Sequence, residues 1–238
     1  MTPRYPGARF YGQGGQGGRC TYRSCSWHEA VTAGGVDAIA GWNSSAGACH
    51  GFTGKDGDCG QYVDFHVSVA GVLNGNGQVL TWENWDGLVV STNRSPDGSF
   101  GPNDIGWTPQ QFERNADIMA WMVDALGIPL HNMQNTEQPG HGPHRLGVPQ
   151  ASGKVQLNYG PTKWTSHAGK QCPGDERIRQ LPAMLARAAV IRDGVRAGRF
   201  GWLPTGPVDL SRVRGTDGVV KPAVSSAEYL RFFTAALR

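Results

Sequence analysis

The sequence predicts an α/β protein in which α-helices flank a mixed central β-sheet. Residues 22–27 and 63–69 alternate between polar and apolar side chains, which is typical of strands. A capped helical pattern begins at Thr108, and a second helical pattern begins at Asp175. Together these segments predict a sheet covered by helices.

The strands are expected in the first half of the chain. Residues 22–27 form a short strand that ends directly before His28. Residues 63–69 and 78–82 flank the turn sequence Asn-Gly-Asn-Gly at 74–77, so they predict a hairpin of central strands. An earlier helix is expected over residues 35–42.

Two longer helices follow. Thr108 is placed as an N-cap with Pro109 at the first helical position, and Gly127 ends the helix. The second helix starts at Asp175 and is expected to bend or restart at Pro182. The inward face of the first helix carries Phe112, Ala116, Met119, Val123 and Leu126.

The 238 residues are enough for one sizeable domain and a short appendage. Residues 1–19, with a glycine-rich run at 12–18, are expected to be a flexible lead-in, and residues 20–193 the main domain. Residues 194–238 are expected to form a linker and a terminal helix capped by Ser225 and Glu228. This extension is too short for a core of its own, so we expect it to dock on the main domain.

The charge pattern excludes several classes of partner. The net charge of +3 and the pI of about 8.7 are only mildly basic, and no basic run with interleaved aromatics indicates nucleic-acid binding. Arg187, Arg192, Arg196 and Arg199 are expected on a solvated helix face.

No apolar span approaches the roughly 20 residues that cross a bilayer, and the N-terminus lacks the apolar core of a signal peptide. We therefore expect synthesis in the cytosol and no membrane insertion.

The segment 144–174 has the composition of a metal site. It gathers His144, His167, Lys170 and Cys172, and Pro173-Gly174 predicts a tight turn after the thiolate. Zinc in a hydrolase takes three protein ligands and leaves the fourth position to water, so a third ligand is needed from elsewhere. His28 is the best donor because it ends a short strand.

These residues resemble the zinc-dependent N-acetylmuramoyl-L-alanine amidases of the peptidoglycan-recognition (type 2 amidase) family. The resemblance is strongest to endolysin amidase domains of phages that infect actinobacteria. It covers roughly residues 5–185 through five features in the family's order. They are residues 5–8; His28; residues 65–69 before 74–79; residues 107–111 with 126–129; and His144-Arg145 followed by residues 169–174.

The resemblance implies a Zn²⁺ site and a reaction. His28 and Cys172 match two zinc ligands, and Lys170 matches the catalytic lysine. The second histidine ligand is either His144 or His167, and the His-Arg motif favours His144. The implied fold is that of the type 2 amidases, and the implied activity cleaves the amide between the N-acetylmuramoyl lactyl group and L-alanine. The implied partner is bacterial peptidoglycan. We expect the protein to act on it as a monomer after release from the host cytoplasm.

The sequence departs from the family at the group that transfers protons. The residue before His66, often Tyr in relatives, is Phe65, and no glutamate occurs in the strand-like residues 88–93. Glu29, Tyr62 and Glu83 are the available substitutes. Two rival functions follow from this departure and from the shared metal chemistry: a non-catalytic peptidoglycan-binding module, and a zinc peptidase that cuts within the stem peptide.

Four further cysteines, Cys20, Cys25, Cys49 and Cys59, lie in the N-terminal region. They predict two disulfides, a second structural metal site with His50, or unpaired thiols.

Overall fold

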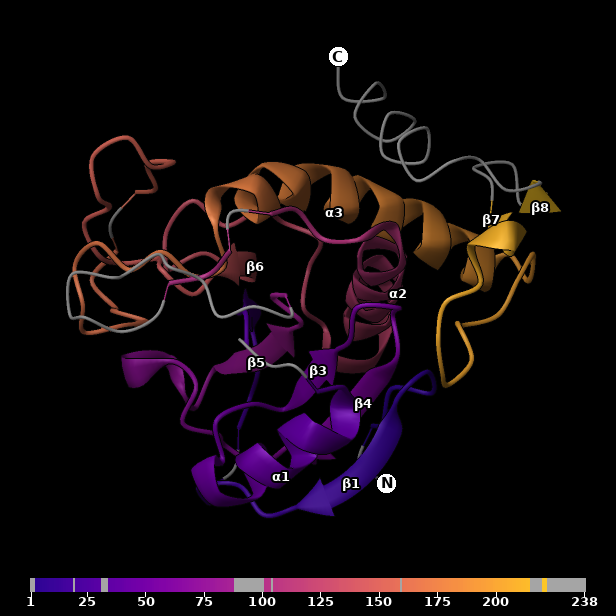
Figure 1. Ribbon diagram of the computed structural model, residues 1–238, viewed down its shortest axis with the longest axis horizontal. Helices are drawn as coiled ribbons and strands as arrows, with labels where there is room; N and C mark the ends of the chain where they lie inside the picture. The colour runs from indigo at the N-terminus through magenta and orange to yellow at the C-terminus, as the bar shows by residue number, and fades with distance from the viewer. Residues whose placement is uncertain are drawn as a thin grey trace.

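A six-stranded mixed sheet lies between one helix on one side and two helices on the other (Figure 1). The computed structural model describes residues 3–18, 20–30, 34–87, 101–103, 105–158, 160–214 and 220–221. The predicted fold class, a mixed sheet flanked by helices, is therefore confirmed.

The described part of the chain forms eight strands, three α-helices and two 3₁₀ turns. In chain order they are β1 (Arg9–Gln13), β2 (Ser24–Trp27), α1 (Val36–Ala46), β3 (Gly51–Thr53), β4 (Cys59–Val63), the 3₁₀ turn η1 (Leu73–Gly75), β5 (Val79–Asn84), α2 (Pro109–Leu126), β6 (Gly140–Pro143), α3 (Asp175–Arg196), the 3₁₀ turn η2 (Leu210–Arg212), β7 (Val213–Arg214) and β8 (Val220–Lys221).

The strand order in the large sheet is β1-β4-β3-β5-β2-β6. Only β3 and β4 pair antiparallel, and every other neighbouring pair is parallel. Strand β2 lies between β5 and β6 and is parallel to both. The carboxyl ends of these three strands therefore meet at one edge of the sheet.

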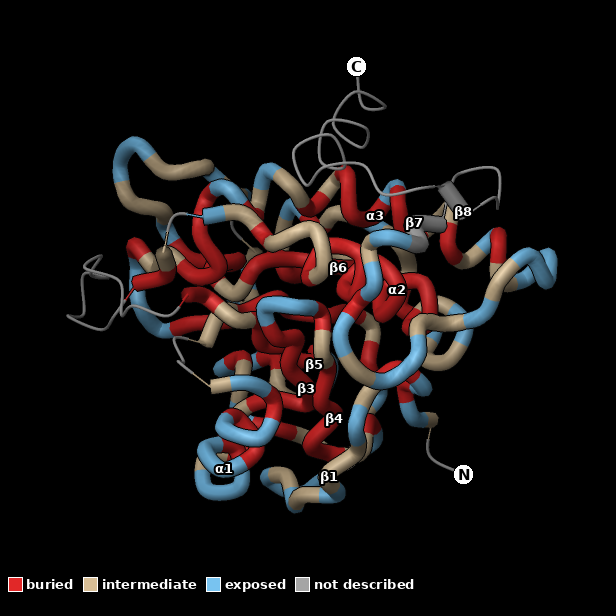
Figure 2. The backbone as a smooth tube through the Cα atoms, turned by 45° about the vertical axis from the view of Figure 1, so that its right-hand side comes forward, coloured by how far each residue is buried: buried red, intermediate tan, exposed pale blue. Residues whose placement is uncertain are grey.

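Each face of the sheet packs on its own helices. Leu80 and Trp82 of β5 join Trp27 of β2 in the cluster that includes α2 and α3. Phe52 of β3 and Tyr62 of β4 join the cluster that includes α1. Strands β2 to β6 and the middle of α2 are buried, whereas the edge strand β1 is not (Figure 2). Two apolar layers thus hold the sheet between the helices.

The helix predicted from Thr108 is confirmed in detail. The Thr108 side chain accepts a hydrogen bond from Gln111 N, and the Gln111 side chain accepts one from Thr108 N, which completes a capping box. Gly127 ends the helix in the left-handed conformation, with φ of 72°. The helix predicted from Asp175 also forms, but it runs through Pro182 without restarting.

The predicted hairpin between residues 63–69 and 78–82 is wrong. Residues 73–75 form a 3₁₀ turn, and the Asn76 side chain accepts a hydrogen bond from Val72 N at 2.8 Å, which stabilises that turn. Strand β5 is buried along its whole length and pairs in parallel with β2 and β3. A strand buried on both faces is typical of parallel sheets, so its neighbours come from distant parts of the chain.

The expectation of a flexible lead-in is wrong for residues 9–13. They form β1, the edge strand, which pairs in parallel with β4. Tyr11 packs on Tyr62 with ring centroids 5.1 Å apart, and Arg9 pairs with Asp37 of α1 at 2.9 Å. Side-chain packing and the backbone ladder therefore fix this segment to the main domain.

The segment after α3 docks on the domain. Phe200, Trp202 and Leu210 pack against the α2–α3 core. The buried guanidinium of Arg114 donates to Pro204 O at 2.8 Å and to Gly206 O at 2.9 Å. The predicted terminal helix at residues 225–238 and the segment 88–93 lie outside the described residues. Across the described chain, none of the helices combines the length and apolar character needed to cross a bilayer.

The capping box makes the first prediction. Replacing Thr108 by alanine removes the hydroxyl that binds Gln111 N and Lys55 O, so the free energy of unfolding should fall by about 1 kcal/mol. For a domain of this size the melting temperature should fall by roughly 2–4 °C. Thr108→Ser keeps the hydroxyl and is the matched control. Equal melting temperatures for the alanine and serine variants would contradict the role of the cap.

Candidate metal centre

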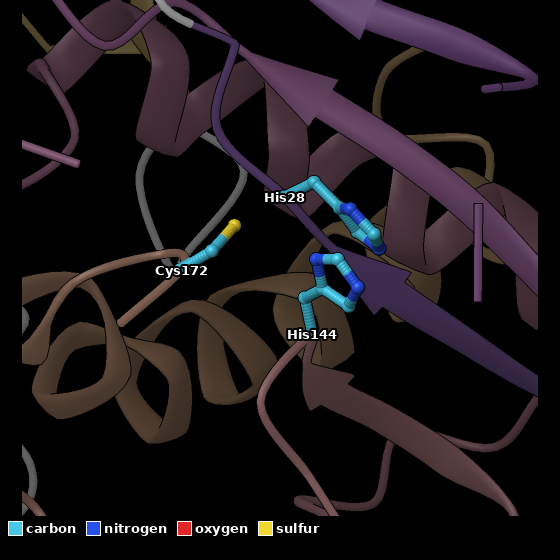
Figure 3. A group of neighbouring side chains, drawn as sticks. All are labelled: His28, His144 and Cys172. Atoms are coloured by element: carbon cyan, nitrogen blue, oxygen red, sulfur yellow. The ribbon is translucent and has the colours of Figure 1, made fainter. Parts of the chain in front are cut away.

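Three side chains from separate segments converge at the carboxyl edge of the sheet. His28 lies one residue beyond β2, His144 one residue beyond β6, and Cys172 in the turn before α3 (Figure 3). Their ligand atoms all lie within 4.8 Å of one another. In the described part of the chain this is the only group of three or more His, Cys, Asp or Glu residues placed to hold a metal ion.

Parallel pairing explains why the two imidazoles meet. The His28 amide donates to Trp82 O at 2.8 Å, and the His144 amide donates to Trp27 O at 3.3 Å. Both residues thus extend ladders of β2, which lies between β5 and β6. The two rings stack with their centroids 3.8 Å apart. The strand ends therefore fix the histidines side by side.

The thiol of Cys172 is brought to the histidines by a tight turn. Gly174 N donates to Gln171 O at 2.8 Å, and Gly174 has φ of 99°, a value that side-chain-bearing residues rarely adopt. The Glu29 amide donates to Cys172 Sγ at 3.3 Å, which ties the turn to the residue after His28. The turn predicted at Pro173-Gly174 is therefore present.

Burial keeps both imidazoles in the form that binds metals. It lowers the pKa of His28 to about 3 and holds the pKa of His144 well below its usual value, and the positive charge of Lys170 adds to both shifts. Burial raises the pKa of the Cys172 thiol, which Lys170 opposes. Neutral imidazole is the ligand form, and metal binding releases the thiol proton.

Each imidazole has one nitrogen held by a neighbour outside the cluster. Ser26 Oγ lies 2.8 Å from His28 Nε2, and the His144 ring hydrogen bonds to the Trp164 backbone. The second nitrogen of each ring, which for His28 is Nδ1 beside Glu83, would then bind a metal, as in histidine ligands whose other nitrogen is oriented by an outer partner. Two imidazoles and one thiolate form a donor set that suits Zn²⁺ and leaves a position for water.

The charges around the cluster also suit a divalent cation. The site contains two cations, Arg177 and Lys170, and four groups that become anions when they ionise. Each of those acids has a pKa raised chiefly by burial. Burial thus favours the neutral forms of these acids, and a bound dication would favour their ionised forms. The four acids are Glu29, Glu83, Asp86 and Cys172.

Glu83 is the carboxyl group that faces the cluster. It lies on β5, and its Oε1 atom is 3.4 Å from His28 Nδ1. Burial raises the pKa of Glu83 to about 8, against a smaller opposing effect of Lys170. Because burial also keeps His28 neutral, the contact between the two groups is not an ion pair. One Glu83 oxygen, Oε2, is buried without a protein partner.

The other sequence candidates lie elsewhere. The Glu29 carboxylate pairs with Arg177 at 3.2 Å and accepts a hydrogen bond from Trp107 Nε1. The Tyr62 hydroxyl donates to Val36 O beneath α1. His167 is exposed and is not part of the cluster. The structure thus brings together His28, His144, Cys172, Lys170 and Glu83.

The predictions of disulfides and of a second metal site are wrong. All five cysteines, each within the described residues, are free thiols. His50 is a satisfied core residue, because its Nε2 lies 2.6 Å from the Tyr22 hydroxyl and its Nδ1 accepts from Thr81 N. Cys25, Cys49 and Cys59 are buried apolar side chains, which is the remaining alternative.

Fold and site together define a mixed α/β protein with a largely buried two-histidine, one-cysteine cluster at the carboxyl edge of its sheet. No family model matches the chain, and no curated protein does. Several solved structures are similar to it, and they are amidases and endolysins.

Three of these structures show the extent of the similarity. N-acetylmuramoyl-L-alanine amidase LysC from Clostridium intestinale URNW is 13% identical, covers 75% of this chain and 97% of its own, and has a TM-score of 0.45. Staphylococcus aureus hydrolase AmiA in complex with its ligand is 10% identical, with 78% and 85% covered and a TM-score of 0.49. A mutant endolysin from Bacillus subtilis is 15% identical, with 77% and 99% covered and a TM-score of 0.45.

The free thiols make the second prediction. Reaction with a thiol reagent in denaturant should detect all five cysteines, because none is oxidised. In the native protein Cys20 should react first among the four N-terminal cysteines, since it is half-buried whereas Cys25, Cys49 and Cys59 are buried. A count of one thiol in denaturant would instead indicate two disulfides.

Proposed function

We propose that this protein is a zinc-dependent N-acetylmuramoyl-L-alanine amidase of the endolysin type. Its substrate is bacterial peptidoglycan, and the bond cleaved joins the lactyl carbonyl of N-acetylmuramic acid to the amino group of L-alanine. The protein acts as a monomer on the cell wall after release from the host cytoplasm. The ordered motifs between residues 5 and 185 support this substrate.

One observation carries the proposal: His28, His144 and Cys172 converge while Lys170 and Glu83 lie beside them. A structural zinc site is usually closed by four protein ligands, whereas a catalytic site has three and an open position. The cluster has three such ligands together with a cation and a carboxyl group. This composition is that of a hydrolytic site.

The zinc ion, when bound, would polarise the scissile carbonyl and lower the pKa of a water molecule. Lys170 has a separate role. Its positive charge acts on all three ligands and on Glu83. It adds to the lowering of both histidine pKa values and opposes the raising of the Cys172 and Glu83 pKa values by burial. An ammonium group in this position stabilises the oxyanion that develops when water adds to the lactyl carbonyl.

Glu83 is proposed as the group that moves the proton. It is the carboxyl group that contacts a ligand and keeps an oxygen without a protein partner. In its ionised form, which a bound dication would favour over the neutral form that burial favours, Glu83 takes a proton from the attacking water and delivers it to the departing amide nitrogen. The carbon–nitrogen bond breaks, the lactyl carbon keeps the hydroxyl, and L-alanine leaves with a free amino group. Glu83 thus takes the proton-transfer role that Phe65, which stands where relatives often have Tyr, cannot perform.

The choice between the two histidines makes the third prediction. His144→Ala removes a ligand, so zinc content after dialysis should fall from one ion per chain to a small fraction. His167→Ala is the control, and because His167 is exposed outside the cluster it should retain full zinc content. Elemental analysis of dialysed protein gives the result. Loss of zinc from the His167 variant alone would exchange the two assignments.

The fourth prediction concerns the bond cleaved. Mass spectrometry of purified actinobacterial wall digested by the parent should show free stem peptides that begin at L-alanine. Lys170→Ala removes the oxyanion cation and should slow release by roughly 10²–10³-fold. Glu83→Gln keeps the shape of the side chain and should slow release by roughly 10²–10⁴-fold. His167→Ala should remain active.

Each rival function has its own outcome in the same digestion. A zinc peptidase would release fragments cut within the stem peptide and leave L-alanine attached to the lactyl group. A binding module would sediment with the wall and release nothing. Either result, obtained with folded and zinc-loaded parent protein, overturns the amidase assignment.

A further inference from the structure

The first turn of α3 forms two buried ion pairs with the residues that follow the two histidines. Asp175 pairs with Arg145, which follows His144. Arg177 pairs with Glu29, which follows His28, with Nε and Oε1 3.2 Å apart. Within one helix turn, Asp175 thus pairs with the arginine next to His144, and Arg177 pairs with the glutamate next to His28.

The same arginines also bind the carbonyl oxygens of the residues on either side of Cys172. Arg177 Nη1 donates to Pro173 O at 2.9 Å, and Arg145 Nη1 donates to Gln171 O at 3.4 Å. The Glu29 amide completes the arrangement by donating to the thiol itself. Each segment that carries a member of the cluster is therefore bonded to this group of charges.

A third acid, Asp86, extends the group beyond the end of β5. Its Oδ1 lies 2.7 Å from Arg177 Nη1, and its carboxylate accepts hydrogen bonds from Asn103 N. Trp107 Nε1 donates to Glu29 from the other side. We call Glu29, Asp86, Arg145, Asp175 and Arg177 the α3 ion-pair cluster.

Stability is a poor explanation for this cluster. Its side chains are at most 4% exposed, and removing such charges from water costs about as much as their attraction returns. Arg177 also lies in the first turn of a helix, where the helix dipole disfavours a cation. A position that is costly in both respects indicates a need for orientation, because the planar guanidinium fixes the direction of its hydrogen bonds to Asp86 and Pro173 O.

We propose that the α3 ion-pair cluster positions His28, His144 and Cys172 for the metal before the metal binds. This inference rests on the proposed zinc site and assigns Asp175 and Arg177 as positioning residues. The imidazoles are fixed through the backbone of the residues that follow them, and the thiol through the carbonyls on both sides. Without the cluster, the metal would have to order three separate segments as it binds.

The test uses Co²⁺ as a spectroscopic substitute for Zn²⁺ in the full chain. Thiolate and imidazole ligation gives Co²⁺ visible and near-ultraviolet absorption that reports the geometry of the site. Both variants keep most of the side chain's volume: Asp175→Asn removes the charge that pairs with Arg145, and Arg177→Lys keeps a cation but loses the guanidinium that binds Glu29, Asp86 and Pro173 O together. The matched controls, Glu113→Gln and Arg187→Lys, make the same two changes in an equally buried ion pair between α2 and α3, with Arg187 Nη2 and Glu113 Oε1 2.6 Å apart.

The Asp175 and Arg177 variants should bind Co²⁺ about 10–100-fold more weakly than the parent, with altered absorption bands. The control variants should lose thermal stability in the metal-free state yet bind Co²⁺ with the affinity and spectrum of the parent. If Arg177→Lys does not fold, Glu29→Gln replaces it, because that variant keeps the amide that donates to Cys172.

Two results overturn the inference, and they can be told apart. Cobalt affinities within about twofold of the parent in folded Asp175 and Arg177 variants would mean that the cluster serves stability alone, while the proposed metal site stands. A folded parent that shows no thiolate-to-cobalt absorption would overturn the metal site and the inference together.

Discussion

The parallel pairing of β2 with β5 on one side and β6 on the other is the constraint on which the site depends. It brings three carboxyl strand ends to one edge, so that Glu83, His28 and His144 become neighbours although they are far apart in the sequence. A shift of one residue in either register would turn the side chains at that edge to the opposite face. The apolar layer of Trp27, Leu80 and Trp82 against α2 and α3 opposes such a shift.

The same core that fixes the strands also places α3. Leu181, Met184 and Leu185 pack in the α2–α3 cluster, so the first turn of α3 reaches the sheet edge in a fixed position. Cys172 lies only three residues before Asp175 and follows the helix to that edge. The site is thus formed where the strand ends meet a helix start, and its charges are buried because the core continues beneath them. Packing and chemistry therefore depend on the same contacts.

Local signals in the sequence were sufficient for parts of the fold and of the site. The cap at Thr108, the end at Gly127 and the turn after Cys172 are each determined by neighbouring residues. Contacts between distant segments were not predictable in this way. Glu83 ranks above Glu29 and Tyr62 as the proton-transfer group only because β5 lies beside β2. The burial of Arg187, which was expected on a solvated face, depends on its pairing with Glu113 of α2. Strand β1 was missed because its partner, β4, lies about 50 residues further along the chain.

X-ray absorption spectroscopy at the zinc edge tests the central claim most directly, because it reports the ligand atoms of the zinc-loaded protein without reference to activity. The account predicts one sulfur scatterer at about 2.3 Å and two imidazole nitrogens at about 2.0–2.1 Å, with a fourth light atom from water. Cys172→Ser should remove the sulfur contribution. A first shell of oxygen and nitrogen alone in the parent protein would contradict the account.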